Sequence, residues 1–308
     1  MFSKKLLIPL LSLSLLVTPA YSSHAAENTE AAGTSVEGQG MLSPSSSSER
    51  SESVFNGSGA GTSSEPVTDE KLETILKQVQ SQLPAENGTW AVFISDLVNG
   101  TEGSLNDQKM QAASLIKLYI MGAVYENYEQ ITGQYGRDSV DSNLYSMITV
   151  SDNDAANTLT TYLGGGDSAA GMQAVNSFCQ AHGYDQTHMG RMLLASNEND
   201  DNYTSVGDCG HLLQEIYKQD TSGYTHATDM FNLLKAQTRC NKIPAQLPEG
   251  VKTANKTGEL DNVENDAGII YDSKNDVVIV FMSQNLSSAG SAQNTIATLS
   301  RTIYDHYN

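Results

Sequence analysis

Positive charge is scarce in this chain of 308 residues. It has 17 Lys and Arg against 36 Asp and Glu, which gives a formal net charge of −19 at pH 7. Nucleic acids and anionic lipid surfaces are themselves negative, so we expect neither as a partner. Hydrophobic residues make up 39% of the chain. This composition is neither that of a disordered chain nor that of a membrane-spanning one.

Cysteine is also rare, with only Cys179, Cys209 and Cys240. Three cysteines allow at most one internal disulfide. We favour a bridge between Cys209 and Cys240, and three ordinary buried thiols stay the alternative. The six histidines are scattered, and the chain contains neither HExxH nor CxxC. No metal site and no cofactor is therefore predicted.

The apolar run near the N-terminus is short. Two lysines precede a run from Leu6 to Val17, and small residues follow as far as Ala25. This order is typical of a secretory signal, which we predict at residues 1–25. A membrane-spanning helix needs about 20 apolar residues, and no cysteine follows to carry a lipid. We expect a secreted or extracellular protein that does not insert into the membrane after signal cleavage.

Large apolar residues are nearly absent from residues 26–66, which are rich in Ser, Gly and Glu. Such a composition cannot bury a core. We predict a disordered acidic linker here, either a spacer through a cell wall or a simple tail. The remaining residues, 67–308, are enough for one substantial domain.

The domain begins with a helical pattern, which a strand pattern follows. The opening segment VTDEKLETILKQVQSQL has helical spacing, with Thr68 as its predicted N-cap. The segment TWAVFISDLVNG at 89–100 then predicts a hairpin that turns at Asn99-Gly100 and returns near 103–105.

Helical patterns dominate from 114 to about 234. Three strand-like runs follow at 251–260, 267–273 and 277–284, and a last helix is predicted at 291–307. Strands at both ends with helices between them predict an α+β fold. Its antiparallel five-stranded sheet is flanked by the N- and C-terminal helices and stands beside an all-helical lobe.

One lysine lies inside the apolar run AASLIKLYIMGAV at 112–124. A buried ammonium must find a partner or lose its proton. Ser114 precedes Lys117 by three residues, so both side chains share a helix face. A neutral, desolvated Lys117 can act as base for the Ser114 hydroxyl, at a helix start that favours negative charge. Taken alone, such a tetrapeptide is more often a Ser near a helix cap followed by a snorkelling Lys.

Two further motifs follow in order. SDN at 151–153 opens the predicted helix DNDAANTLTTYL, and KTG at 256–258 lies on the first late strand. S-x-x-K, S-D-N and K-T-G form the signature of penicillin-recognising serine enzymes. The sequence therefore resembles class A β-lactamases and related D,D-peptidases over nearly all of 67–308. The stretches SDNDAANTL, KTGELDNVENDAGII and YTSVGDCGHLL are also similar to that family.

The resemblance implies four catalytic residues: Ser114, Lys117, Ser151 and Lys256. Ser114 is the acylated nucleophile and Lys117 is its base. Ser151 relays a proton to the leaving nitrogen, and Lys256 supplies positive potential.

It also implies four substrate-binding residues: Asn153, Thr257, Gly258 and Glu259. Asn153 holds the substrate's side-chain amide and Thr257 binds its carboxylate. The backbone N–H of Glu259 forms the oxyanion hole together with that of Ser114. These roles match what acyl transfer requires: an activated hydroxyl, an anion hole and a proton donor for the amine.

The loop after Arg191 departs from the family pattern. The second residue after Arg191 is Leu193. At this position class A β-lactamases carry the glutamate that activates the deacylating water. Glu198 is the only glutamate in RMLLASNENDDNYTS; it is either a substitute base or a solvated loop residue. Asp200 and Asp201 are predicted to pair with Arg191 and pin the loop.

The hairpin after KTG contains no arginine, although many relatives keep one there for the substrate carboxylate. That task falls to Lys256 and Thr257, or to Arg239, whose position in space the sequence does not give.

Three functions follow from the resemblance. The first is an exported serine hydrolase that forms an acyl-enzyme on Ser114 with β-lactams or D-Ala-D-Ala-type peptidoglycan peptides and releases penicillins slowly. The second is a working class A β-lactamase with a relocated base. The third is a non-catalytic sensor module that binds β-lactams or peptidoglycan.

Overall fold

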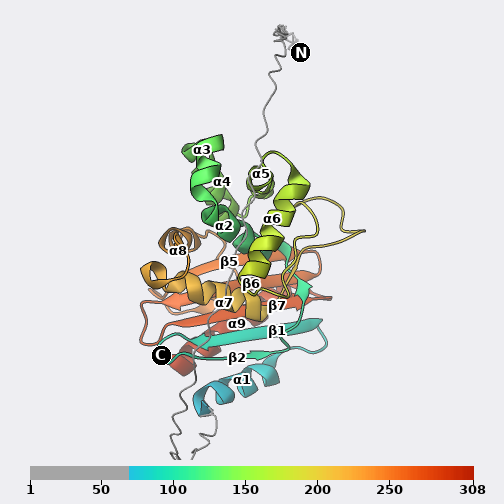
Figure 1. Ribbon diagram of the computed structural model, residues 1–308. Helices are drawn as coiled ribbons and strands as arrows, with labels where there is room; N and C mark the ends of the chain where they lie inside the picture. Colours follow the sequence, from blue (N-terminus) through green and yellow to red (C-terminus); the bar gives the residue numbers. More distant parts are fainter. Residues whose placement is uncertain (1–68) are drawn as a thin grey trace, which may run out of the picture. The chain divides into compact units, whose positions relative to one another are not determined.

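The computed structural model describes residues 69–308 (Figure 1). The predicted signal peptide, the predicted linker and Thr68 lie outside these residues. The helices are α1 (Glu70–Gln82), α2 (Ile116–Glu126), α3 (Tyr128–Tyr135), α4 (Arg137–Thr149), α5 (Asn153–Leu163), α6 (Ser168–Ala181), α7 (Val206–Tyr217), α8 (Ala227–Lys235) and α9 (Ala289–Tyr307). Short 3₁₀ turns are η1 (Ala113–Leu115), η2 (Gln219–Thr221) and η3 (Ile243–Gln246).

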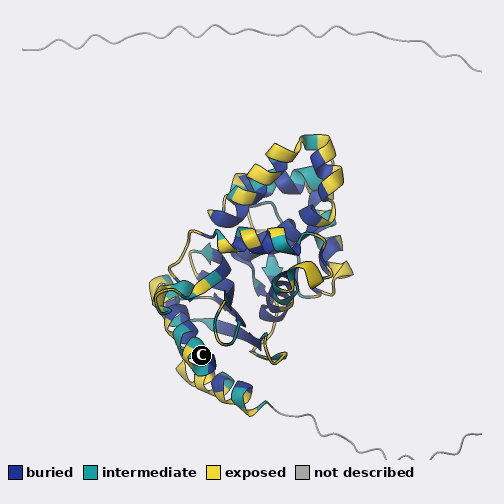
Figure 2. Ribbon diagram, turned by 90° about the vertical axis from the view of Figure 1, so that its left-hand side faces the viewer, coloured by how far each residue is buried: buried dark blue, intermediate teal, exposed yellow. Residues whose placement is uncertain are grey.

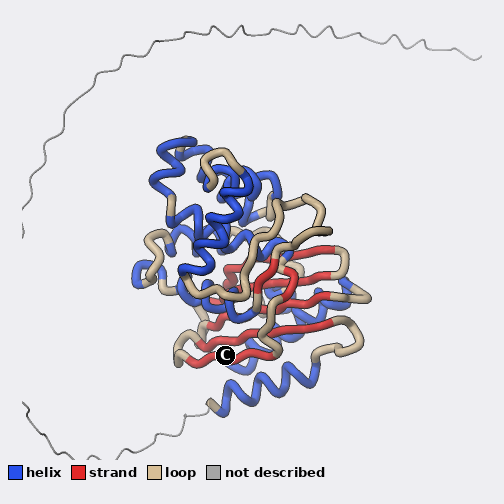
Figure 3. Tube along the Cα trace, turned by 45° about the vertical axis from the view of Figure 1, so that its right-hand side comes forward, coloured by secondary structure: helices blue, strands red, loops and turns tan. Residues whose placement is uncertain are grey.

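The main sheet has five antiparallel strands in the order β2-β1-β7-β6-β5 (Figure 1). Figure 3 shows its strands in red, with helices on both sides of the sheet. They are β1 (Thr89–Asp96), β2 (Thr101–Leu105), β5 (Lys252–Leu260), β6 (Val263–Tyr271) and β7 (Val277–Gln284). The predicted α+β fold and its five-stranded sheet are confirmed. A separate short pair joins β3 (Met110–Gln111) to β4 (Tyr203–Thr204).

The N-terminal part of the domain forms the predicted helix and hairpin, with a cap one residue later than predicted. The Asp69 side chain accepts hydrogen bonds from the N–H groups of Lys71 and Leu72, so the N-cap of α1 is Asp69 and the prediction of Thr68 is wrong. The β1–β2 hairpin turns at the predicted Asn99-Gly100, where Gly100 has φ +69°. That left-handed backbone costs glycine little.

The sheet separates two hydrophobic cores. Helices α1 and α9 cover one face, and their buried residues recur at helical spacing. Figure 2 colours the buried residues of the domain dark blue. The other face meets the helical lobe, in which α7 and α8 lie against the sheet and α2 lies behind them. The buried residues that face the sheet are Leu72, Ile75 and Val79 on α1, and they include Ala292, Ile296, Leu299 and Ile303 on α9.

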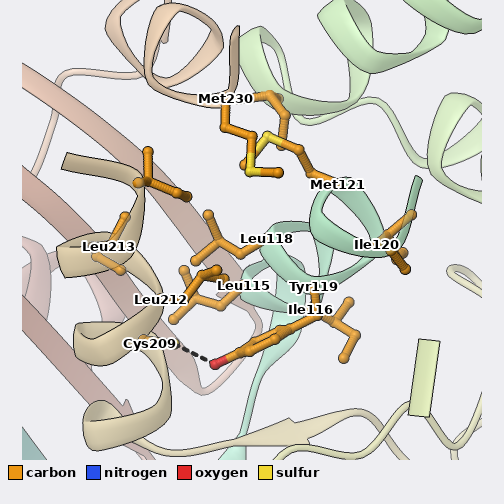
Figure 4. Packing of buried hydrophobic residues seen from close by; sticks show 14 of the residues in the cluster. Leu115, Ile116, Leu118, Tyr119, Ile120, Met121, Cys209, Leu212, Leu213 and Met230 are labelled. Atoms are coloured by element: carbon orange, nitrogen blue, oxygen red, sulfur yellow. Dashed lines mark hydrogen bonds between the residues drawn. The ribbon is translucent and has the colours of Figure 1, made fainter. Parts of the chain in front are cut away.

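Helix α2 is the centre of the helical lobe. Every residue from Ile116 to Tyr125 is buried, as the apolar run predicts. Figure 4 shows part of this core, with Leu118 and Tyr119 of α2 near Leu212 and Cys209 of α7. The Tyr119 hydroxyl bonds the Thr204 hydroxyl at 2.7 Å and reaches Cys209 Sγ at 3.4 Å. Lys117 is the lysine within this apolar helix, and its side chain has no exposed surface.

The structure corrects two expectations. All three cysteines are free thiols, with Cys179 and Cys209 buried and Cys240 exposed, so the bridge between Cys209 and Cys240 is wrong. Strand β6 begins at Val263 rather than at 267, because its polar first residues are buried with partners in the fold. No helix among residues 69–308 is long and apolar enough to cross a membrane.

Candidate active site

Ser114 and Lys117 meet at the entry to α2. Ser114 lies in η1, directly before the helix, and Lys117 lies in the first turn of α2. The Lys117 Nζ is 3.2 Å from Ser114 Oγ. The spacing of three residues therefore places both groups on one side of the helix start, as predicted.

Four oxygen atoms surround the amine of Lys117. Its Nζ lies 2.7 Å from the Ser151 carbonyl and 2.7 Å from Asn153 Oδ1. Both of these oxygens can only accept hydrogen bonds, so they occupy two N–H groups. In the neutral amine the remaining position is a lone pair, which can accept a hydrogen bond from the Ser114 hydroxyl at 3.2 Å. The Ser151 hydroxyl lies 3.1 Å from the same nitrogen.

Burial is the main cause of a low pKa for Lys117, and the positive charge of Arg239 adds to it. The nearby carboxylate of Asp152 acts in the opposite direction. Together these effects lower the pKa of Lys117 from 10.5 to about 7. At neutral pH a large fraction of this amine is therefore available as a base.

Ser151 lies between two lysines. Its Oγ is 3.1 Å from Lys117 Nζ and 2.9 Å from Lys256 Nζ. Ser151 follows α4 with φ +61°, a left-handed backbone that costs a non-glycine residue about 1–3 kcal/mol. Lys256 is fully buried, and burial followed by the charge of Lys117 holds its pKa well below 10.5.

Asn153 begins α5, and the preceding Asp152 caps that helix by accepting the N–H of Ala155 at 2.8 Å. The cap fixes the direction of the first turn of α5. It thereby helps to aim the Asn153 amide at Lys117, so the SDN motif brings two side chains to the same amine.

Strand β5 carries the KTG motif past Ser114. A Cβ added at Gly258 would lie 2.9 Å from the Ala112 carbonyl and 3.2 Å from the Ser114 nitrogen, so the strand needs glycine to approach η1. Thr257 is buried, and Glu259 lines the cavity beside Ser114. The structure thus gathers all eight predicted site residues around the entry to α2 and along β5.

A cavity of about 360 Å³ opens beside Ser114. Its floor and walls come from η1, the start of α5, the end of β5 and the loop after Arg191. The lining residues are Ala113, Ser114, Asn153, Arg191, Leu193, Leu194, Ala195, Ser196, Asn197, Glu259 and Leu260. Among these residues Glu259 is the one carboxylate.

The loop after Arg191 is held by two side chains. Asn157 of α5 accepts the N–H of Leu193 at 2.8 Å and donates to its carbonyl at 3.0 Å. Arg191 pairs with Asp201 at 2.7 Å, as predicted. The expected pairing with Asp200 is wrong, because Asp200 binds His188 at 2.8 Å instead.

Glu198 lies in the same loop and is exposed; it is not among the residues that line the cavity. In the structure it is a surface residue. The carboxylate that does line the cavity, Glu259, already binds Lys242 at 3.0 Å and Arg239 at 3.0 Å.

Sequence reasoning missed the ion network behind β5. Lys242 is fully buried and binds Glu264 at 2.7 Å as well as Glu259. Asp266 accepts hydrogen bonds from Asn255 and the Ile243 N–H, and burial raises its pKa to about 6. The polar residues that open β6 were the available signal, since charged side chains inside a buried strand need partners.

Arg239, which the sequence could not place, lies at the mouth of the site. Its Nη1 binds Glu259 and its Nη2 is 3.4 Å from the Val150 carbonyl. Within residues 69–308, no group of three His, Cys, Asp or Glu side chains is placed to hold a metal ion.

Solved structures of β-lactamases share this fold. The β-lactamase of Sphaerobacter thermophilus DSM 20745 superposes with a TM-score of 0.63 and 22% identity, over 75% of this chain and 95% of its own. PBP-A superposes with a TM-score of 0.66 and 22% identity, over 76% and 96%. A point mutant of PBP-A, solved as an acyl-enzyme complex with penicillin G, gives 0.65 and 22%, over 76% and 96%. None of the curated proteins matches the chain.

The fold and the gathered motifs define a serine hydrolase of the β-lactamase-like superfamily. A sequence model described as the β-lactamase enzyme family matches residues 71–138 and 134–307. The chain belongs to this family.

Proposed function

We propose that the protein is a serine acyl-transfer enzyme that forms an acyl-enzyme on Ser114. The observation that carries this proposal is the environment of Lys117. Two acceptor oxygens take its N–H groups, and the Ser114 hydroxyl lies 3.2 Å from its nitrogen. With a pKa of about 7, Lys117 can accept the hydroxyl proton at neutral pH.

In the acylation step, the Ser114 oxygen attacks the substrate carbonyl as its proton moves to Lys117. The backbone N–H groups of Ser114 and Glu259 stabilise the oxyanion. Lys117 then returns the proton through Ser151 to the departing nitrogen, and the C–N bond breaks. Ser151 suits this relay because its Oγ lies between the two lysine nitrogens.

The proposed substrates are β-lactams and D-Ala-D-Ala-type peptidoglycan peptides, which share an acyl group, a leaving nitrogen and a carboxylate. We assign the carboxylate to the side of the site that holds Lys256, Thr257 and Arg239, where the Arg239 guanidinium carries positive charge. PBP-A, of which a mutant carries penicillin G as an acyl-enzyme, supports reactivity with penicillins. Export through residues 1–25 would bring the enzyme to such peptides.

Release of a penicilloyl group is proposed to be slow. General base catalysis contributes about 10²–10⁴-fold to such a step. The cavity is lined by one carboxylate, that of Glu259, and both of its oxygens are bound to cations. A peptidase depends less on this base, because an amine or water can resolve its acyl-enzyme after the leaving group has departed.

Intact-mass measurement after mixing with penicillin G tests the proposal. We expect an adduct of one penicillin on the wild type that persists, none on Ser114→Ala, and an unchanged adduct on Ser81→Ala, an exposed control on α1. Rapid turnover of penicillin would favour a β-lactamase with a relocated base. An adduct without peptide hydrolysis would favour a sensor, and no adduct would reject covalent function.

A further inference from the structure

We propose that three consecutive residues after α8, Gln237, Thr238 and Arg239, position Ser151 for proton transfer; we call them the 237–239 bracket. The inference rests on the proposed function, because it concerns the step in which the nitrogen leaves. None of the three contacts the nucleophile. They act by fixing the backbone on which Ser151 stands.

The bracket binds the carbonyl end of α4. The last carbonyls of a helix have no partners within the helix and must find them elsewhere. Gln237 Nε2 donates to the Ile148 carbonyl at 3.0 Å. The N–H and the hydroxyl of Thr238 donate to the Thr149 carbonyl at 3.0 and 2.9 Å.

Arg239 extends the same series by one residue. Its Nη2 is 3.4 Å from the carbonyl of Val150, which directly precedes Ser151. Three successive bracket residues thus bind three successive carbonyls. These bonds fix the position of the backbone where the chain leaves α4 and enters Ser151.

The other side of the bracket holds β5. Gln237 Nε2 is also 3.5 Å from the Asn255 carbonyl, one residue before Lys256. Arg239 Nη1 binds Glu259 at 3.0 Å, three residues after Lys256. Gln237 is buried, and its Oε1 accepts the Arg239 N–H at 3.0 Å, which ties the bracket together.

The bracket therefore joins the two elements between which Ser151 works. The Ser151 backbone has φ +61°, a conformation that a non-glycine residue keeps only when its surroundings enforce it. Its Oγ must stay near both Lys117 and Lys256 to pass a proton. A shift of α4 against β5 would lengthen one of these contacts.

Substrates with different leaving groups separate this role from a general structural one. A β-lactam nitrogen needs a proton to leave, which Ser151 supplies in the proposed mechanism. A thiolate leaves as the anion, so a thioester of an acylated D-amino acid needs the Ser114–Lys117 pair but not the relay. Damage to the relay alone should slow acylation by the β-lactam and spare acylation by the thioester.

The test uses Gln237→Met with Thr238→Val, a double variant that keeps side-chain size and removes the side-chain donors. Acylation of the full-length protein by penicillin G is expected to fall about 10–100-fold, since small misplacements cost up to about 100-fold. Acylation by the thioester is expected to stay within about threefold. Thr238→Ser, which keeps the hydroxyl, should match the wild type with both substrates.

Equal losses with both substrates, or no loss with penicillin, would overturn the inference. If the double variant does not fold, Thr238→Val alone decides the question, because Thr238 is exposed and its backbone N–H bond is retained. Absence of any acylation of the wild type would instead reject the proposed function.

Discussion

The pH dependence of acylation should report the pKa of Lys117. An ordinary lysine, with a pKa of 10.5, is about 0.03% neutral at pH 7, whereas a pKa of about 7 leaves about half of it neutral. The lowered pKa therefore provides about 1,500-fold more neutral amine at this pH. Because the neutral form acts, the rate constant should be at its plateau above pH 8 and fall about tenfold per pH unit below 7.

The assay is the second-order rate constant for acylation by penicillin G between pH 5 and 9. Arg239→Gln removes a charge that lowers the pKa of Lys117, so the midpoint should move to higher pH. Asp152→Asn removes a carboxylate that raises this pKa, so the midpoint should move lower. Arg301→Gln, on exposed α9 surface, is the matched control. A midpoint near 4 or above 10, or no shift in either variant, would refute the reasoning.

Three further results are expected. Gly122→Ala should lower the free energy of unfolding by about 1–3 kcal/mol in urea, because its Cβ would lie 2.4 Å from the Phe178 ring, and this clash exceeds the gain in helix propensity of up to about 1 kcal/mol. Lys242→Met should cost about 3–5 kcal/mol in the same assay by leaving Glu264 buried without its cation; an equally stable variant would contradict this. Glu198→Gln should leave the release rate of the penicilloyl group unchanged, since its side chain is exposed outside the cavity; a tenfold slower release would instead identify it as the base.

The sequence could predict what depends on short spacing. Ser114 and Lys117 meet because three residues separate them on one helix, and Asn153 follows a cap that the sequence itself encodes. The strand patterns near both ends of the domain were enough to predict the sheet.

Long-range partners escaped prediction for a physical reason. Arg239 and Lys242 acquire their roles from Glu259 and Glu264, which lie 20 and 22 residues away and meet them only after β5 and β6 have paired. No periodic pattern in the local sequence indicates such a long-range contact. The prediction of a disulfide failed for the same reason, since spacing along the chain does not give the distance between two sulfurs.

The pairing of β1 with β7 has a consequence for how the protein matures. Thr89 lies opposite Gln284, so the central seam of the sheet joins segments from the two ends of the domain. Contacts this distant in sequence form late and slowly, because a long loop must close first. Lys117, the proposed base, can be synthesised and even helical long before β5 arrives beside it. Chemical competence should therefore emerge only at the end of folding, when nearly the whole chain is available.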